Sequence, residues 1–167
     1  MRTIARTPRF IIREFKADEE DTYLSLFDDP EVTVHLPKRT KDEHRRLFKE
    51  TLQEYAENSL CGRWGMFTTD DTDCMGMCLL RHFEGSKDKM ELGYVLHKKY
   101  WGQGIASEMA QIMTKHAFKQ TGALQVVAVT TFGNVASQKV LEKAGLKRMD
   151  NYVRGGEEAA FFCISAD

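Results

Sequence analysis

The chain has 167 residues, of which 42% are hydrophobic and 29% are charged. This composition is ordinary for a globular protein and excludes the charge-rich, aromatic-poor signature of disorder, and the length suits one domain over residues 1–167. The formal net charge is −1, from 24 basic and 25 acidic residues, so no overall basic field favours nucleic acid or an anionic membrane as a partner. An anionic ligand must therefore be held by local groups.

The N-terminus and the cysteines predict a soluble, cytoplasmic protein. Residues 1–8 lack the apolar core of a secretory signal, and no run approaches the roughly 18 apolar residues of a membrane-spanning helix. The cysteines are too sparse for a disulfide-stapled secreted fold, so we expect reduced thiols. Cys74 and Cys78 have no histidine pattern nearby, which favours buried small side chains over a metal site.

The first half of the chain is predicted to contain a strand, two helices and a meander of strands. Residues 10–15 are short and β-rich, and the acidic residues within 17–21 suit the start of a helix that Asp29-Pro30 should end. The Thr-x-x-Glu spacing of residues 40–43 is that of a capping box and predicts a second helix. Three β-prone runs separated by turn formers then follow, at residues 63–69, 74–83 and 89–97.

The second half predicts a helix, a strand, another helix and two last strands. Residues 105–120 have small and apolar residues at helical spacing, with Gly122 as the C-terminal stop. The β-branched run 125–131 reads as a buried strand reached by a crossover, so it should lie parallel to its neighbour. Asn134 should cap the next helix, with Ala136, Val140, Leu141 and Ala144 facing inward. Strands over residues 147–153 and 157–164 are joined by Gly155-Gly156, which suits a hairpin turn.

The stretch Trp101-Gly102-Gln103-Gly104-Ile105-Ala106 lies between a predicted strand and a predicted helix. Its glycines let the backbone approach a ligand closely, and the free N–H groups of a helix start can hold a diphosphate without a cluster of lysines. Read alone the pattern is weak, because two glycines also simply make a tight turn. A nicotinamide-binding turn fails on spacing, since Ser107 stands where the third glycine is needed.

Four motifs in the same order carry a resemblance to a known family. They are Asp29-Pro30-Glu31-Val32, Glu91-Leu92-Gly93-Tyr94-Val95-Leu96, the turn at residues 101–106, and Asn134-Val135-Ala136-Ser137 followed by residues 140–146. The chain resembles the GNAT superfamily of acetyltransferases, and within it the RimJ/RimL-like ribosomal-protein N-acetyltransferase branch. Lys99 departs from the pattern, which prefers Arg or Gln at that position.

The resemblance implies an α/β (α+β) single-domain GNAT fold. Its mixed, mostly antiparallel sheet should have about six to seven strands with splayed central parallel strands, flanked by about four helices. The cosubstrate is acetyl-CoA, with no metal. The pantetheine arm would lie where residues 91–97 and 125–131 splay apart, and backbone N–H groups of the turn would take the diphosphate. The cofactor-binding residues implied in this way are Tyr94, Val95, Leu96, Gly102, Gln103, Gly104, Ile105, Ala106, Asn134 and Ser137.

The resemblance also implies catalytic residues, each with a structural alternative. Glu91 matches a glutamate near the acceptor amine in related enzymes and is the candidate base, directly or through a water, although it could equally be salt-bridged on a sheet face. The backbone N–H near Val95 is the expected oxyanion donor. Ser137 is the candidate to protonate the departing thiolate, or simply belongs to the start of a helix. Tyr152 competes with it, or packs as a strand residue.

The expected activity is transfer of acetyl to a primary amine by direct attack in a ternary complex. The acceptor is either a protein N-terminus or a small-molecule amine, because a fold-level likeness does not transfer substrate identity. The alternative is a non-catalytic acyl-CoA-binding sensor domain. We expect no nucleic acid and no membrane partner, and the oligomeric state stays open, with a homodimer as a reasonable expectation for a small enzyme.

Overall fold

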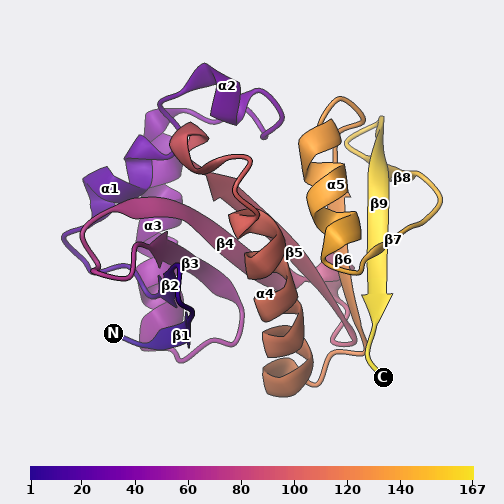
Figure 1. The fold of residues 1–167 in the computed structure, drawn as a ribbon, viewed down its shortest axis with the longest axis horizontal. Helices are drawn as coiled ribbons and strands as arrows, with labels where there is room; N and C mark the ends of the chain where they lie inside the picture. Colours follow the sequence, from indigo (N-terminus) through magenta and orange to yellow (C-terminus); the bar gives the residue numbers. More distant parts are fainter. The chain divides into compact units, whose positions relative to one another are not determined.

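Nine strands and five helices form in the structure, a computed structural model that describes residues 1–167. Figure 1 shows the chain as a ribbon, coloured along the sequence. The chain divides into two compact units, unit 1 with residues 1–79 and 94–103, and unit 2 with residues 80–93 and 104–167. Helices and mostly antiparallel strands occur in the combination that the sequence predicts, so the mixed α/β class is confirmed.

Strands and helices alternate in short groups along the chain. In order they are β1 (Thr3–Arg6), β2 (Ile11–Arg13), α1 (Glu20–Ser25), α2 (Pro30–Thr33), α3 (Lys41–Ala56), β3 (Gly62–Phe67), β4 (Cys74–His82), the 3-10 turn η1 (Phe83–Gly85), β5 (Lys89–Leu96), the 3-10 turn η2 (Lys98–Tyr100), α4 (Ile105–Thr121), β6 (Gln125–Thr130), α5 (Val135–Lys143), β7 (Lys147–Arg148), β8 (Tyr152–Arg154) and β9 (Glu157–Ser165). Hydrogen-bonded neighbours follow the order β1-β2-β3-β4-β5-β6-β9-β7, and β8 pairs with β9.

Unit 1 is built on antiparallel strands and an aromatic core. Strand β2 pairs with β1 and β3, and the rings of Phe15, Tyr23, Phe48 and Phe67 pack mostly edge to face, with centroids 5.3 to 6.0 Å apart. Aromatic pairs favour such geometry because the ring edge is positive and the face negative. The core joins segments on both sides of α3, so this helix is fixed mainly by burial of its apolar stripe.

Proline 30 begins a helix rather than only ending one, which corrects the sequence prediction. Helix α1 already ends at Ser25, and Pro30 is the first residue of the short helix α2. Asp29 caps α2, because its side chain accepts the Glu31 N–H at 2.9 Å. Proline suits this first helical position, since it has no N–H to leave unpaired and its φ is already helical.

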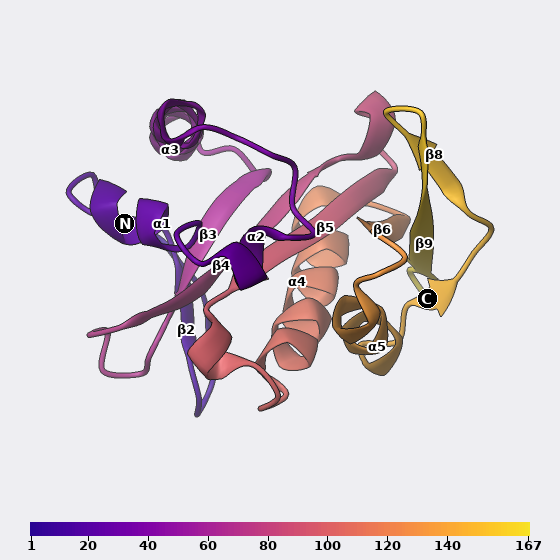
Figure 2. The ribbon, with the colours of Figure 1, turned by 90° about the horizontal axis from the view of Figure 1, so that it is seen from above.

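Unit 2 contains residues 89–93 of β5, the parallel strand β6, and the helices α4 and α5. Both helices lie on the same side of β6 and β9 (Figures 1 and 2). In α4 the predicted inward face is confirmed, with Ala110, Met113 and Ala117 fully buried. In α5 the prediction for Ala136 is wrong, because this residue is exposed and Ser137 is buried, whereas Leu141 and Ala144 are buried as predicted.

The chain end forms a broken strand rather than the single one predicted over residues 147–153. Short strands β7 and β8 both pair with the nine-residue β9. Gly155 and Gly156 have φ of 58° and 80°, which confirms the predicted hairpin turn, because both central residues of such a turn need positive φ. This split and the unpredicted strand β1 account for nine strands in place of six to seven.

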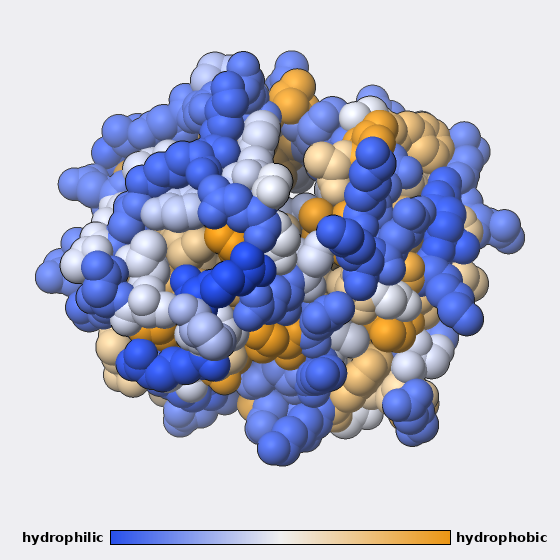
Figure 3. Space-filling view, in the orientation of Figure 1, coloured by the Kyte–Doolittle hydropathy of each residue, from blue (hydrophilic) through white to orange (hydrophobic).

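The surface is largely hydrophilic on the face in Figure 3, with scattered apolar patches. None of the helices has the length and apolar character needed to cross a membrane. Cys74 and Cys78 are free and buried, as predicted, and burial raises the pKa of each thiol to about 12.

The capping box of α3 gives a direct test of local stability. Thr40 accepts the Glu43 N–H at 3.2 Å, and the Glu43 carboxylate accepts the Thr40 N–H at 2.6 Å. Replacing Thr40 by Ala should lower the free energy of unfolding by about 1 kcal/mol, because one N–H at the helix start loses its acceptor. Urea titration measures this, with the exposed mid-helix Lys49→Ala as control. Equal stability of the two variants would contradict the assigned cap.

Candidate active site

Two left-handed glycines shape the turn before α4. Gly102 has φ of 72° and Gly104, the N-cap residue, has φ of 76°. A Cβ atom on Gly102 would meet nothing within 4 Å, so glycine is required there for its backbone conformation and not for space. Glu108 N–H donates to Gly104 at 3.1 Å as the first bond of the helix. The N–H groups of Ile105, Ala106 and Ser107 precede it and are available to an anion.

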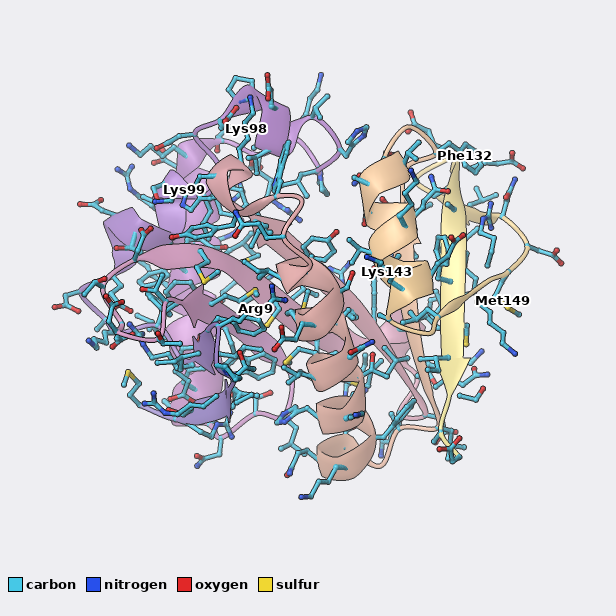
Figure 4. The ribbon with its side chains drawn as sticks, in the orientation of Figure 1. Arg9, Lys98, Lys99, Phe132, Lys143 and Met149 are labelled. Carbon is cyan, nitrogen blue, oxygen red and sulfur yellow. The ribbon has the colours of Figure 1, made fainter.

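Side chains of unit 1 hold the first part of this turn. The Trp101 indole donates to the Leu96 carbonyl at 2.9 Å, and the Arg9 guanidinium donates to the Gln103 carbonyl at 2.6 Å. The Gln103 amide donates to the Lys99 carbonyl at 3.0 Å. Arg9, labelled in Figure 4, comes from the chain between β1 and β2. The acceptors of these three bonds are the carbonyl groups of Leu96, Gln103 and Lys99.

Lys98 and Lys99 on η2 (Figure 4) are both paired with carboxylates. Lys99 Nζ lies 2.5 Å from Asp73, and the Tyr100 hydroxyl donates to the same carboxylate. The hydrogen bond from Lys99 holds the pKa of Asp73 below its usual range. Lys99, the residue that departs from the family pattern, therefore serves a contact within unit 1.

Tyr94, Val95 and Leu96 end strand β5, where glycine on β4 permits a close backbone approach. A Cβ atom on Gly76 would lie 2.2 Å from the Val95 carbonyl oxygen and 3.0 Å from the Leu96 Cα atom. Any larger residue at position 76 would push this end of β5 away. Gly76 was not predicted from the sequence, because the contact is between distant segments and leaves no local pattern.

The parallel pairing of β5 and β6 stops early. Its register covers Lys89 with Gln125, Met90 with Val126 and Glu91 with Val127, although β6 continues to Thr130. On its other edge β6 pairs with β9 along its whole length. Residues 128–130 of β6 therefore lie beyond the parallel ladder.

Glu91 is buried in unit 2 between two arginines. Arg154 on β8 donates to both carboxylate oxygens, at 2.8 and 3.1 Å, and Arg81 on β4 donates to Oε2 at 3.0 Å. The Glu91 side chain is 8% exposed, whereas those of Arg81 and Arg154 are 50% and 42% exposed. Burial works to raise the pKa of Glu91, but hydrogen bonds and charge attraction from Arg154 and Arg81 outweigh it, and the pKa lies below its ordinary value.

This geometry leaves Glu91 one acceptor position. A carboxylate offers about four lone-pair sites, and the two arginines occupy three of them. The remaining site belongs to Oε1, which accepts only from Arg154. Glu91 is thus ionised at neutral pH, and one lone-pair position on Oε1 receives no hydrogen bond from the arginines.

Tyr152 on β8 contacts the turn η1. Its hydroxyl donates to the Glu84 carboxylate, and its ring stacks on Phe161, with 5.5 Å between centroids, and tilts against Phe83 at 5.3 Å. The hydrogen bond to Glu84 and burial raise the pKa of Tyr152. Its proton is already shared with a carboxylate, which weakens it as an acid.

Asn134 and Ser137 lie together at the start of α5. The Asn134 side chain accepts the Ser137 N–H at 3.1 Å, so the predicted cap forms. Ser137 is 8% exposed in the first turn of the helix. Phe132, just before this cap, is 46% exposed (Figure 4).

The unit-2 candidates thus form two groups, Glu91 with its arginines and Asn134 with Ser137. Sequence reasoning missed Arg81 and Arg154, which lie 10 and 63 residues from Glu91. No short-range pattern marks such partners, since the sheet brings them together. No group of three or more His, Cys, Asp or Glu side chains is arranged to hold a metal ion.

The comparisons with known proteins agree with this architecture. The family model of the acetyltransferase (GNAT) domain matches residues 9–147. The uncharacterized N-acetyltransferase p20 of Bacillus licheniformis is 24% identical over 149 residues, which cover 85% of this chain and 84% of that protein. The chain belongs to the GNAT acetyltransferase family and is an acyltransferase.

Solved structures share the fold over nearly the full chain. The ribosomal-protein-S5-alanine acetyltransferase of Vibrio fischeri superposes with a TM-score of 0.84 at 15% identity, covering 100% of this chain and 98% of that one. RimL, a ribosomal L7/L12 alpha-N-protein acetyltransferase in complex with coenzyme A, gives a TM-score of 0.81 at 14% identity and covers 98% of each chain. At these identities the likeness shows the fold.

The ion pairs of Glu91 predict a pH-dependent loss of stability in Glu91→Gln. Because the folded pKa of Glu91 is depressed, its contribution is present above the unfolded pKa and is lost as pH falls through the folded one. We expect the variant to lose about 1 to 3 kcal/mol at pH 7, less than for a fully buried pair because both arginines are half exposed. The difference from wild type should shrink below about pH 4.

Urea unfolding at pH 7, 5 and 3.5 measures this difference. The matched control is Glu158→Gln, an exposed glutamate on β9. A loss for Glu91→Gln that stays constant with pH would mean that packing, and not charge, accounts for it.

Proposed function

We propose that this protein is an acetyl-CoA-dependent N-acetyltransferase that acts on a primary amine by direct attack in a ternary complex. The observation that carries the proposal is the N-terminus of α4, preceded by two left-handed glycines, in a chain that matches the GNAT model over this segment. Acetyl-CoA supplies an activated acetyl thioester. The chain's residues bind it, orient the acceptor and manage the protons.

Backbone groups fit this cosubstrate better than side chains do. The N–H groups of residues 102–106 suit the diphosphate, because the helix start adds its positive end to free donors. In unit 2, the edge of residues 128–130 that lies beyond the parallel ladder suits an amide-containing arm that adds hydrogen bonds as a strand does. In unit 1, Tyr94, Val95 and Leu96 at the end of β5 are proposed cofactor-binding residues from the family resemblance. Asn134 is the proposed polar contact from α5, and the Val95 N–H is the proposed donor to the thioester oxygen.

Glu91 and Ser137 are the side chains proposed for chemistry. Glu91 is ionised and keeps one open acceptor site on Oε1, as a base acting directly or through water requires. Ser137 is proposed to hydrogen-bond the departing thiolate. Tyr152 is the alternative donor, but its hydroxyl already donates to Glu84, which favours Ser137.

The charge around Glu91 favours an α-amine as acceptor. A carboxylate held between two guanidinium groups is a weak base, which suffices for an α-amine of pKa about 7.7 to 8.0 but less well for lysine near 10.4. The likeness to a ribosomal alpha-N-protein acetyltransferase supports a protein N-terminus and the RimJ/RimL-like branch. A small-molecule α-amine is the alternative. The proposal places the protein in the cytoplasm, with both units acting as one domain.

Release of thiol from acetyl-CoA tests the activity and the acceptor class together. Peptides with a free N-terminus should give kcat/KM at least ten-fold above N-terminally blocked peptides with one lysine at pH 7.5, because a larger fraction of the α-amine is neutral. Thermal stabilisation by coenzyme A without thiol release from any amine would instead identify an acyl-CoA sensor.

Gly102 and Gly122 give a matched pair for the cosubstrate site. Both have φ near 71° and open space where a Cβ atom would be, so each change to Ala should cost about 1 to 2 kcal/mol of stability through backbone strain. Only Gly102→Ala should weaken coenzyme A binding, by ten-fold or more, measured by calorimetric titration. Equal affinities of the two variants for coenzyme A would contradict a role of the turn in binding it.

A further inference from the structure

Arg154 connects the C-terminal hairpin to the candidate base. It lies at the end of β8, two residues after Tyr152, so both side chains project from the same side of the strand. Its two Nη atoms donate to the two oxygens of Glu91 at 2.8 and 3.1 Å. Such a forked contact fixes the plane of the carboxylate as well as its charge, which a single lysine cannot do.

Only arginines provide charged contacts that can fix the plane and charge of the Glu91 carboxylate. Arg81 from β4 approaches Oε2 with a single bond through Nε, at 3.0 Å. On β6 the residue opposite Glu91 is the apolar Val127. The charged groups that face the carboxylate are therefore Arg154 from β8 and Arg81 from β4, and Arg154 alone contacts Oε1, the oxygen with the open acceptor site.

Strand β8 is itself anchored beside Arg154. The Tyr152 hydroxyl donates to Glu84 on η1, and its ring packs on Phe161 of β9. The Arg154 guanidinium lies 5.5 Å from the centre of the Tyr152 ring, within cation–π range. A short strand that pairs only with β9 is thus tied to the connection between β4 and β5.

We propose that Arg154 is a positioning residue for acetyl transfer, holding the Glu91 carboxylate ionised and oriented so that Oε1 accepts a proton from the acceptor amine or its water. Arg81 supports this from β4. The role rests on the proposed base function of Glu91, and it makes the β8 hairpin part of the catalytic machinery. Tyr152 then acts by fixing Arg154, which gives the tyrosine a use other than proton donation.

The test compares Arg154→Ala and Arg154→Lys with the control Arg148→Ala. Arg148 is an exposed arginine of the same unit that bonds Asn151 at 2.5 Å and does not contact Glu91. For each variant we would measure kcat/KM against pH, the KM for acetyl-CoA, and the titration of the Glu91 carboxyl by 13C NMR. The NMR titration reads the carboxylate without relying on activity.

Arg154→Ala should lower kcat/KM about 10- to 100-fold, as expected for a misplaced catalytic group, with the KM for acetyl-CoA unchanged. The acid limb of its profile of kcat/KM against pH should move to higher pH, because Glu91 loses a cation that favours its charged form. In Arg154→Lys the acid limb should return most of the way to its wild-type pH, but kcat should recover less. Lysine restores the positive charge without the two-bond contact to the carboxylate. Arg148→Ala should match the wild type in all three measurements. If Arg154→Ala does not fold, Arg154→Lys alone still tests the proposal.

Three outcomes overturn the proposal, and they can be told apart. A wild-type profile and an unmoved Glu91 titration in Arg154→Ala would exclude the positioning role while leaving acetyl transfer intact, as would normal turnover of Glu91→Gln. Absence of acetyl transfer by the wild-type protein to any amine would contradict the proposed function, and the positioning role with it.

Discussion

The early end of parallel pairing between β5 and β6 is the constraint on which the rest of unit 2 depends. After Glu91 and Val127 the two strands no longer share a ladder, while β6 remains fixed on its other edge by β9. Backbone N–H and C=O groups that leave a ladder must find other partners, in water or in a ligand. In the proposed function, the amides of an extended arm would satisfy these groups. The last paired residue of β5 is also the one that bears the buried carboxylate.

The architecture separates binding from chemistry. In the proposed function, binding falls to backbone groups at the helix start behind Gly102 and Gly104, which would let a chain of net charge −1 hold an anionic ligand. The same proposal gives the chemistry to a few side chains whose protonation is set by their neighbours. Glu91 stays ionised because the attraction of Arg81 and Arg154 exceeds the cost of burial. If Glu91 is the base, as proposed, this balance limits its strength, and the proposed preference for an α-amine rests on that limit.

Local signals in the sequence predicted the fold class, the capping box, the crossover strand and the Asn134 cap, because each depends on residues a few positions apart. The same signals failed where pairing between distant segments decides whether a strand forms. Strand β1 forms because β2 offers it an edge, and residues 147–153 break because β9 pairs with two separate segments. Glu91 was found through the family likeness, but Arg154 lies 63 residues away and becomes visible only in the folded sheet. Gly76 was missed for the same reason, since the Val95 carbonyl that excludes a side chain there belongs to another strand.

Amide NMR during titration with coenzyme A tests the proposed cosubstrate site most directly, because it reports which backbone groups meet the ligand. We predict the largest shift changes at the N–H groups of residues 102–106, with further changes at residues 94–96 and 128–130. Changes at Thr40 and along α3 should be small. Binding that leaves residues 102–106 unperturbed, or no binding at millimolar coenzyme A, would contradict the claim that this backbone holds the acetyl donor.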